Sequence, residues 1–89
     1  MREFLIFDPL IGGFFNRVDS GRARKGERSG FIRSNGGRNI NVLGKSYTEY
    51  QLVWYFTTGV FPDRPITTIN GDPLDSRFEN LVQVSPIIL

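Results

Sequence analysis

The side chains best able to do chemistry gather in residues 66–81, where two carboxylates, Asp72 and Asp75, stand among turn-forming residues. Two carboxylates three positions apart in a turn can hold a divalent cation, which prefers oxygen ligands. Asp-Pro and Asp-x-Arg turns, however, usually have local structural roles. We therefore expect no metal or cofactor here. We expect Asn80 to hold the loop through backbone hydrogen bonds and Arg77 to pair with a neighbouring carboxylate.

The composition removes the common alternatives to a carboxylate site. The chain contains no histidine and no cysteine. The usual general base of metal-dependent hydrolysis is therefore missing, and neither a disulfide nor a thiolate metal site can form. The sequence predicts no catalytic residue.

The basic residues are unevenly distributed. Residues 1–45 carry nine Lys or Arg and four Asp or Glu, a net charge of +5, whereas residues 46–89 carry two basic and five acidic residues, a net charge of −3. This asymmetry indicates that the first half faces an anionic partner; the alternative is a solvated loop that keeps a small protein soluble. The candidate residues for binding nucleic acid or a partner are Arg17, Arg22, Arg24, Lys25, Arg28, Arg33, Arg38 and Lys45.

The elements that must position these groups form one domain, residues 1–89, because so short a chain has a single small core. In residues 1–46, short apolar runs closed by turn-forming residues predict antiparallel strands, and the polar residues 19–29 predict a surface loop. Asn-Gly-Gly at 35–37 predicts a hairpin turn because these residues tolerate positive φ. A second tight turn is predicted over residues 43–46.

The rest of the chain predicts one main helix followed by a strand, a turn and a last strand. Residues 47–59 predict the helix, because Thr48 with Gln51 three residues later is a capping-box pattern and Gly59 is a typical helix stop. Residues 60–89 predict strands over 65–70 and 81–85. We expect an α+β fold in which a small antiparallel β-sheet packs on one main helix.

The order of these segments resembles a known family of nucleases. Residues 66–81 read ITTINGDPLDSRFENL, close to the pattern I-D-H-I-N-G-D-x-x-D-N-R-x-x-N-L of HNH endonucleases of the homing and phage type. Residues 7–13 resemble the F-D-P-x-x-G opening of phage HNH proteins, residues 47–54 resemble Y-x-x-H-R-L-A-W, and residues 59–62 resemble the G-x-x-P that follows. The resemblance covers most of the chain.

The resemblance fails where the family's chemistry resides. It implies a site in which an aspartate binds one metal ion and a histidine activates water. Thr67 and Thr68 stand at these two positions, and Tyr50 replaces a histidine on the helix. The family continues into a helix with a further metal ligand, whereas this sequence ends with the apolar residues 86–89. The resemblance thus implies a degenerate HNH, or ββα-metal-like, strand–turn–strand that lacks the terminal helix.

These observations predict a non-catalytic binding module derived from an HNH scaffold, specifically a small phage-type protein that binds and inhibits or modulates a host nucleic-acid-handling enzyme such as a polymerase or nuclease. A net charge of only +2 favours a protein partner. The alternatives are a DNA-binding protein without sequence preference that uses the basic loop on duplex DNA, a residual metal-dependent HNH endonuclease with relocated ligands, and a dimerising module.

Two further expectations concern the cellular location of the protein and the role of its last residues. No apolar run approaches the length of a membrane span, so we expect a cytoplasmic protein, in the host cytoplasm if it is phage-encoded. The apolar residues 87–89 are a candidate docking strand, although closing the core or self-association fits them better. The sequence leaves the partner and the oligomeric state open.

Overall fold

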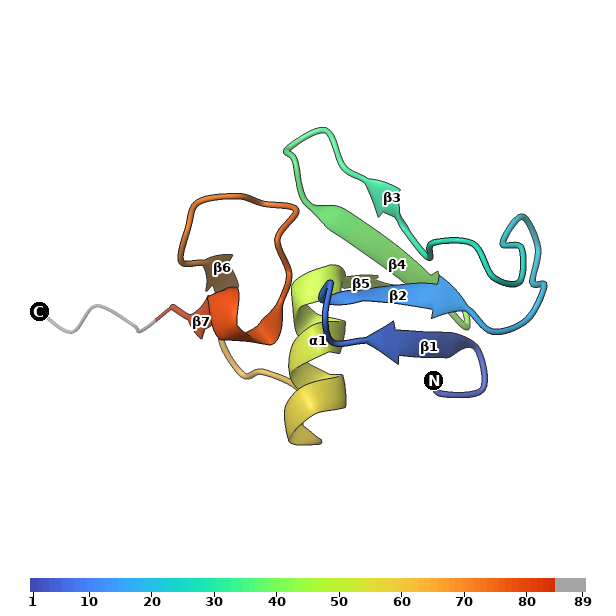
Figure 1. Cartoon of the computed structure of the whole chain (residues 1–89), viewed down its shortest axis with the longest axis horizontal. Coiled ribbons are helices and arrows are strands. Elements are labelled where there is room, and N and C mark those ends of the chain that lie inside the picture. The colour runs from blue at the N-terminus through green and yellow to red at the C-terminus, as the bar shows by residue number, and fades with distance from the viewer. Residues whose placement is uncertain (85–89) are drawn as a thin grey trace, which may run out of the picture.

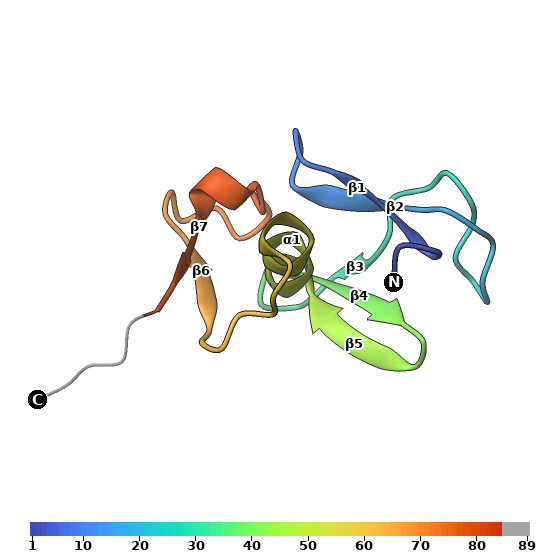
Figure 2. The same cartoon turned by 90° about the horizontal axis from the view of Figure 1, so that it is seen from below.

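The computed structural model describes residues 1–84, in which one α-helix is surrounded by three small antiparallel sheets (Figure 1). In chain order the elements are β1 (Leu5–Asp8), β2 (Gly13–Asn16), β3 (Phe31–Ile32), β4 (Arg38–Val42), β5 (Lys45–Thr48), α1 (Glu49–Thr58), β6 (Ile66–Thr68), the 3₁₀ turn η1 (Phe78–Asn80) and β7 (Leu81–Gln83). Figure 2 looks along α1 and places it between β1–β2, β3–β4–β5 and β6–β7. The α+β class is confirmed.

The first half of the chain forms two sheets, whereas the sequence predicted one. The reason is that the backbone of residues 26–29 returns along the outer edge of β2. Asn16 N donates to Glu27 O at 2.9 Å, and Ser29 N donates to Phe14 O at 2.8 Å. Because its edge is occupied in this way, β2 has no free backbone groups with which to join β4. The strand β3 pairs with β4 instead.

The helix begins at Glu49, directly after the predicted N-cap Thr48, so residues 47 and 48 of the predicted segment 47–59 lie before it. Residues 45–48 continue the hairpin of β4 as β5, in register from Val42↔Lys45 to Asn39↔Thr48. The turn is therefore only two residues long, Leu43 and Gly44, both with positive φ (53° and 78°). Such a turn matches the twist of paired strands, so the prediction of a turn over 43–46 was too long.

The predicted helix caps are confirmed. The Thr48 side chain accepts a hydrogen bond from Gln51 N at 3.1 Å, and Gln51 Oε1 accepts one from Thr48 N at 2.9 Å. Each bond satisfies a backbone N–H that the first turn leaves free. Gly59 ends the helix in the left-handed region, with φ 85°.

The core lies where the three sheets meet α1. Phe14 is fully buried; its ring lies 5.2 Å from Phe7 and 4.9 Å from Phe56 between centroids. Burying large rings gives a small domain much apolar area per residue. The buried apolar residues are Leu5, Phe14, Ile40, Val42, Leu52, Val53, Phe56 and Leu81.

The first hairpin turn touches the segment that resembles the nuclease motif. Gly12 has φ +65°, and a Cβ atom there would lie 2.2 Å from Arg77 N and 2.4 Å from the carbonyl carbon of Ser76. Only glycine allows this approach without displacing backbone. The turn after β1 thus helps to fix the loop between β6 and β7.

The last elements are shorter than predicted. The strand predicted over 65–70 is Ile66–Thr68, and the strand predicted over 81–85 is Leu81–Gln83. Residue 85, the last residue of the strand predicted over 81–85, lies outside the described residues, as does the candidate docking strand of residues 87–89. Among residues 1–84, no helix is both long and apolar enough to cross a membrane.

Candidate functional site

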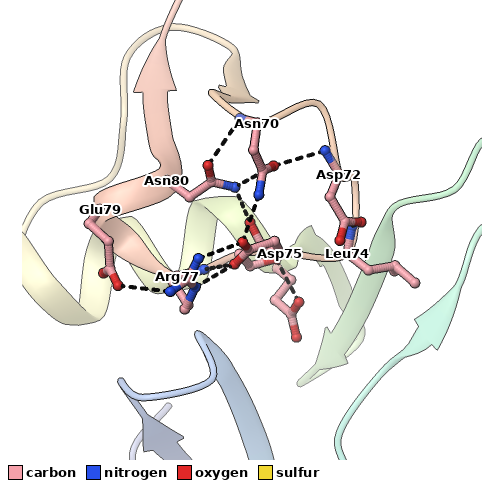
Figure 3. A network of polar contacts seen from close by, with 9 residues as sticks. Asn70, Asp72, Leu74, Asp75, Arg77, Glu79 and Asn80 are labelled. Atoms are coloured by element: carbon pink, nitrogen blue, oxygen red, sulfur yellow. Dashed lines mark hydrogen bonds and ion pairs between the residues drawn. The ribbon is translucent and has the colours of Figure 1, made fainter.

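The loop between β6 and β7 is closed by its own polar side chains (Figure 3). Asn80 Oδ1 accepts from Asn70 N at 3.1 Å, and Asn80 Nδ2 donates to Asn70 Oδ1 at 3.0 Å and to Asp75 O at 2.9 Å. Asn70 Nδ2 donates to Asp75 Oδ2 at 2.9 Å. The predicted role of Asn80 in holding this loop is confirmed.

The two carboxylates that could have bound a cation are used inside the loop. Asp72 Oδ1 accepts from Leu74 N at 3.0 Å, as in an Asx turn. Asp75 accepts two bonds from Arg77, from Nε and Nη2 at 2.8 Å each. Arg77 also lies 3.6 Å from Glu79. Within residues 1–84, no three His, Cys, Asp or Glu side chains are grouped so that they could hold a metal ion.

The Asp75–Arg77 pair predicts an acid-sensitive loop. The hydrogen bonds from the Arg77 guanidinium lower the pKa of Asp75 from 3.8 to about 2. Because the folded-state pKa is the lower one, the contribution of this pair to stability is fully present above pH 3.8 and is lost as the pH falls through about 2. We expect a carboxyl titration of Asp75 by NMR to show a midpoint near 2, with the Asn70 amide shifting in parallel.

The control for this titration is Arg77→Lys, which keeps the positive charge and removes the bidentate hydrogen bonds to Asp75. In this variant the midpoint of Asp75 moves up towards 3.8. A midpoint near 3.8 in the unmodified protein would contradict the pairing.

The three positions that depart from the nuclease motif do not share a cleft. Thr67 is exposed on β6, opposite Val82, and Thr68 lies opposite Leu81. Tyr50 stands in the first turn of α1, and its hydroxyl donates to Pro73 O. Burial raises the pKa of Tyr50. Tyr50 lines a cleft of about 460 Å³ that includes neither threonine.

The most constrained charged group is one that the sequence reasoning missed. Glu49 is 1 % exposed. Its Oε1 accepts from Ser76 Oγ at 2.7 Å, and its Oε2 lies 3.1 Å from Arg28 Nη2 and 3.7 Å from Arg38 Nε. Four segments therefore meet at one carboxylate. The available signal was spacing, since Glu49 occupies the same helix face as the buried residues 52, 53 and 56.

The eight predicted basic residues do not all face solvent. Arg28 and Arg38 turn inward to pair with Glu49. Arg33 is half-buried and packs against Gly37. The five basic residues that remain exposed are Arg17, Arg22, Arg24, Lys25 and Lys45. Four of these five follow one another in a single loop.

Residues 17–28, the arginine loop, have a defined shape (Figure 1, upper right of β2). The buried Asn16 donates from Nδ2 to Arg24 O at 3.0 Å and accepts from Gly26 N at 2.8 Å. Ser20 and Ala23 exchange backbone hydrogen bonds, and Asp19 Oδ1 accepts from Lys25 N at 2.8 Å. The loop therefore presents its cations from a hydrogen-bonded frame.

The arginine loop forms one side of a groove of about 910 Å³. Val42 and Leu43, at the end of β4 and in the turn after it, also line this groove, as does Phe31. The groove thus combines cations with aliphatic surface. This combination suits an acidic ligand that also carries apolar groups.

The chain was compared with known protein families, curated proteins and solved structures, and no match was found in any of them. The resemblance to HNH endonucleases therefore depends on the motif residues themselves.

Proposed function

We propose that this chain is a non-catalytic binding module built on a degenerate HNH-like frame, and that it acts by holding an acidic surface of a protein that handles nucleic acids. In its specific form the proposal is a small phage-type protein that inhibits or modulates a host polymerase or nuclease. The single observation that carries it is the difference between the loop that holds Asp72 and Asp75 and the arginine loop. The motif's carboxylates bond within their own loop, whereas four of the five cations of the arginine loop, Arg17, Arg22, Arg24 and Lys25, are exposed.

The loss of catalysis is supported by the chemistry of the motif. Hydrolysis by a single metal ion needs a ligand carboxylate and a base with a pKa near the working pH. Thr67 and Thr68 supply neither, since a threonine hydroxyl stays protonated in this range. Asp75 already accepts two hydrogen bonds from Arg77. A metal ion would have to displace this guanidinium.

Binding to a protein is supported by the limited charge and by the groove. A protein that wraps duplex DNA needs many phosphate contacts, and two of the eight predicted cations instead neutralise Glu49. Arginines beside aliphatic surface are typical of protein interfaces, where arginine is enriched and the centre is apolar. The net charge of only +2 also favours a protein partner over duplex DNA.

Duplex DNA remains the second candidate because Arg17, Arg22, Arg24 and Lys25 are exposed on one loop. Binding of this kind has no sequence preference and falls steeply with salt. A titration of duplex DNA at low and physiological salt separates the two candidates. Binding that survives physiological salt and weakens more than about tenfold when the loop charges are reversed would favour DNA.

The proposal predicts that a host protein is retained through the arginine loop. The test is affinity capture from a nuclease-treated lysate of the host cell, with Arg22→Glu/Arg24→Glu compared with Arg64→Glu/Thr57→Glu/Thr67→Glu. Both variants change the net charge equally, but only the first alters the loop. We expect the captured protein to be lost with the loop variant and kept with the control. Equal retention by both variants would overturn the assignment of the loop.

A further inference from the structure

We propose that the groove between the arginine loop and β4 binds an extended acidic segment of the partner, with alternating carboxylate and aliphatic side chains, as an added strand at the open edge of β4. This inference rests on the proposed function, since it names the part of a partner protein that the arginine loop would hold. Three features of residues 1–84 support it: an open backbone edge, unpaired arginines and an aliphatic wall.

The open edge follows from the register of the sheet. The strand β3 pairs with β4 only at Arg38 and Asn39. In this register Gly30 follows opposite Ile40, and Ser29, opposite Asn41, would be the next residue to exchange hydrogen bonds with β4, but its N–H donates to Phe14 O at 2.8 Å. Within the described part of the chain, no strand therefore covers this side of β4 beyond Asn39.

The orientation of the open backbone groups follows from the turn after β4. Val42 and Lys45 close a two-residue hairpin, so they exchange hydrogen bonds with each other. Antiparallel residues alternate between bonding to one side and to the other. The N–H and C=O of Asn41 therefore point away from β5, into the groove that Asn41 lines. This is the arrangement to which a peptide strand adds.

The charge of the groove selects an acidic strand. Arg22 and Arg24 line it, and within residues 1–84 neither forms an ion pair with a carboxylate. Arg24 is oriented by a hydrogen bond from Nη1 to Gly21 O at 3.3 Å. Two guanidiniums beside an open strand edge, one of them oriented by a hydrogen bond, match carboxylates on a bound peptide.

The wall of the groove favours a peptide over single-stranded nucleic acid. Its aliphatic residues include Val18, Val42 and Leu43; Leu43 is 72 % exposed. Of the two phenylalanines that line it, Phe4 is partly buried and Phe31 is 50 % exposed, whereas single-stranded nucleic acid is held by several rings on which successive bases stack. An extended peptide presents alternate side chains to the two walls.

The test uses a dye-labelled octapeptide of alternating aspartate with valine or leucine, followed by fluorescence anisotropy on the full chain. We expect a dissociation constant below about 1 mM at low salt. Arg22→Glu/Arg24→Glu should weaken binding more than about tenfold, because charges beside an apolar wall are screened less than free ones. The control Arg64→Glu/Thr57→Glu/Thr67→Glu has the same change of net charge at exposed positions outside the groove and should weaken binding less than about twofold.

A second readout separates strand addition from charge attraction. Hydrogen exchange of the Asn41 amide should slow in the saturated complex, because that N–H gains an acceptor. Unchanged exchange at Asn41, no detectable peptide binding, or tighter binding of a twelve-nucleotide oligothymidylate would each overturn the inference. If capture of the host protein still depends on the arginine loop in that case, the proposed function stands and only this docking mode is wrong.

Discussion

Replacing Glu49 by alanine is expected to lower the free energy of unfolding by about 3–5 kcal/mol, because removing one partner of a buried ion pair leaves the others without compensation. Arg28 and Arg38 would face an empty apolar position, and the Ser76 hydroxyl would lose its acceptor at 2.7 Å. An 89-residue domain has a total stability of roughly 4–13 kcal/mol. The variant is therefore expected to be unfolded or nearly so.

The measurement is urea unfolding followed by circular dichroism. The matched control is Glu79→Ala, since Glu79 is 67 % exposed and pairs with Arg77 at 3.6 Å; the cost there should stay below about 1 kcal/mol. Adding Arg38→Met to Glu49→Ala should recover part of the loss by removing an uncompensated charge. Equal effects of the two alanine substitutions would contradict the role of Glu49 as the junction of four segments.

Phe14→Ala is the second substitution for which we expect a large effect, again about 3–5 kcal/mol. Phe14 is fully buried and contacts the rings of Phe7 and Phe56 from two other elements. Its removal leaves a cavity between the first hairpin and α1. It also removes ring–ring contacts that add to the loss of buried area.

The comparison for Phe14 is the same substitution at Phe31, which is 50 % exposed. Thermal unfolding should show a much smaller shift of the midpoint for Phe31→Ala, since less apolar area is lost there. Similar shifts for the two variants would contradict the placement of the core around Phe14.

Features set by neighbouring residues were predictable from the sequence. Thr48 with Gln51 marked the start of the helix and Gly59 marked its end, and both were confirmed because caps depend on residues within one turn. The first hairpin and the pairing of β3 with β4 were found for the same reason. The local role of Asn80 was also confirmed.

Features that depend on distant segments were not predictable in this way. The division into three sheets arises because residues 26–29 occupy the edge of β2, which no local pattern indicates. The same is true of Arg28 and Arg38, which belonged to the predicted binding set and instead pair with Glu49. A charged residue on the apolar face of a helix is the pattern that would have directed attention to that site.

The groove shows a further limit of sequence reasoning. The arginine loop was recognised by its charge, but its aliphatic wall comes from β4 and the turn after it, near Val42 and Leu43. These residues were assigned only to a strand and a turn. The juxtaposition depends on how the returning backbone of residues 26–29 positions the loop beside β4.

The most direct test of the central claim, that this chain binds and does not cut, is a supercoiled-plasmid assay with Mg²⁺ and with Mn²⁺. The control is Asp72→Asn/Asp75→Asn purified in parallel, which keeps the shape of both side chains and removes the carboxylate charge that a metal ion needs. We predict that neither protein nicks the plasmid with either metal. Metal-dependent nicking by the unmodified chain that is lost in the control variant would contradict the account.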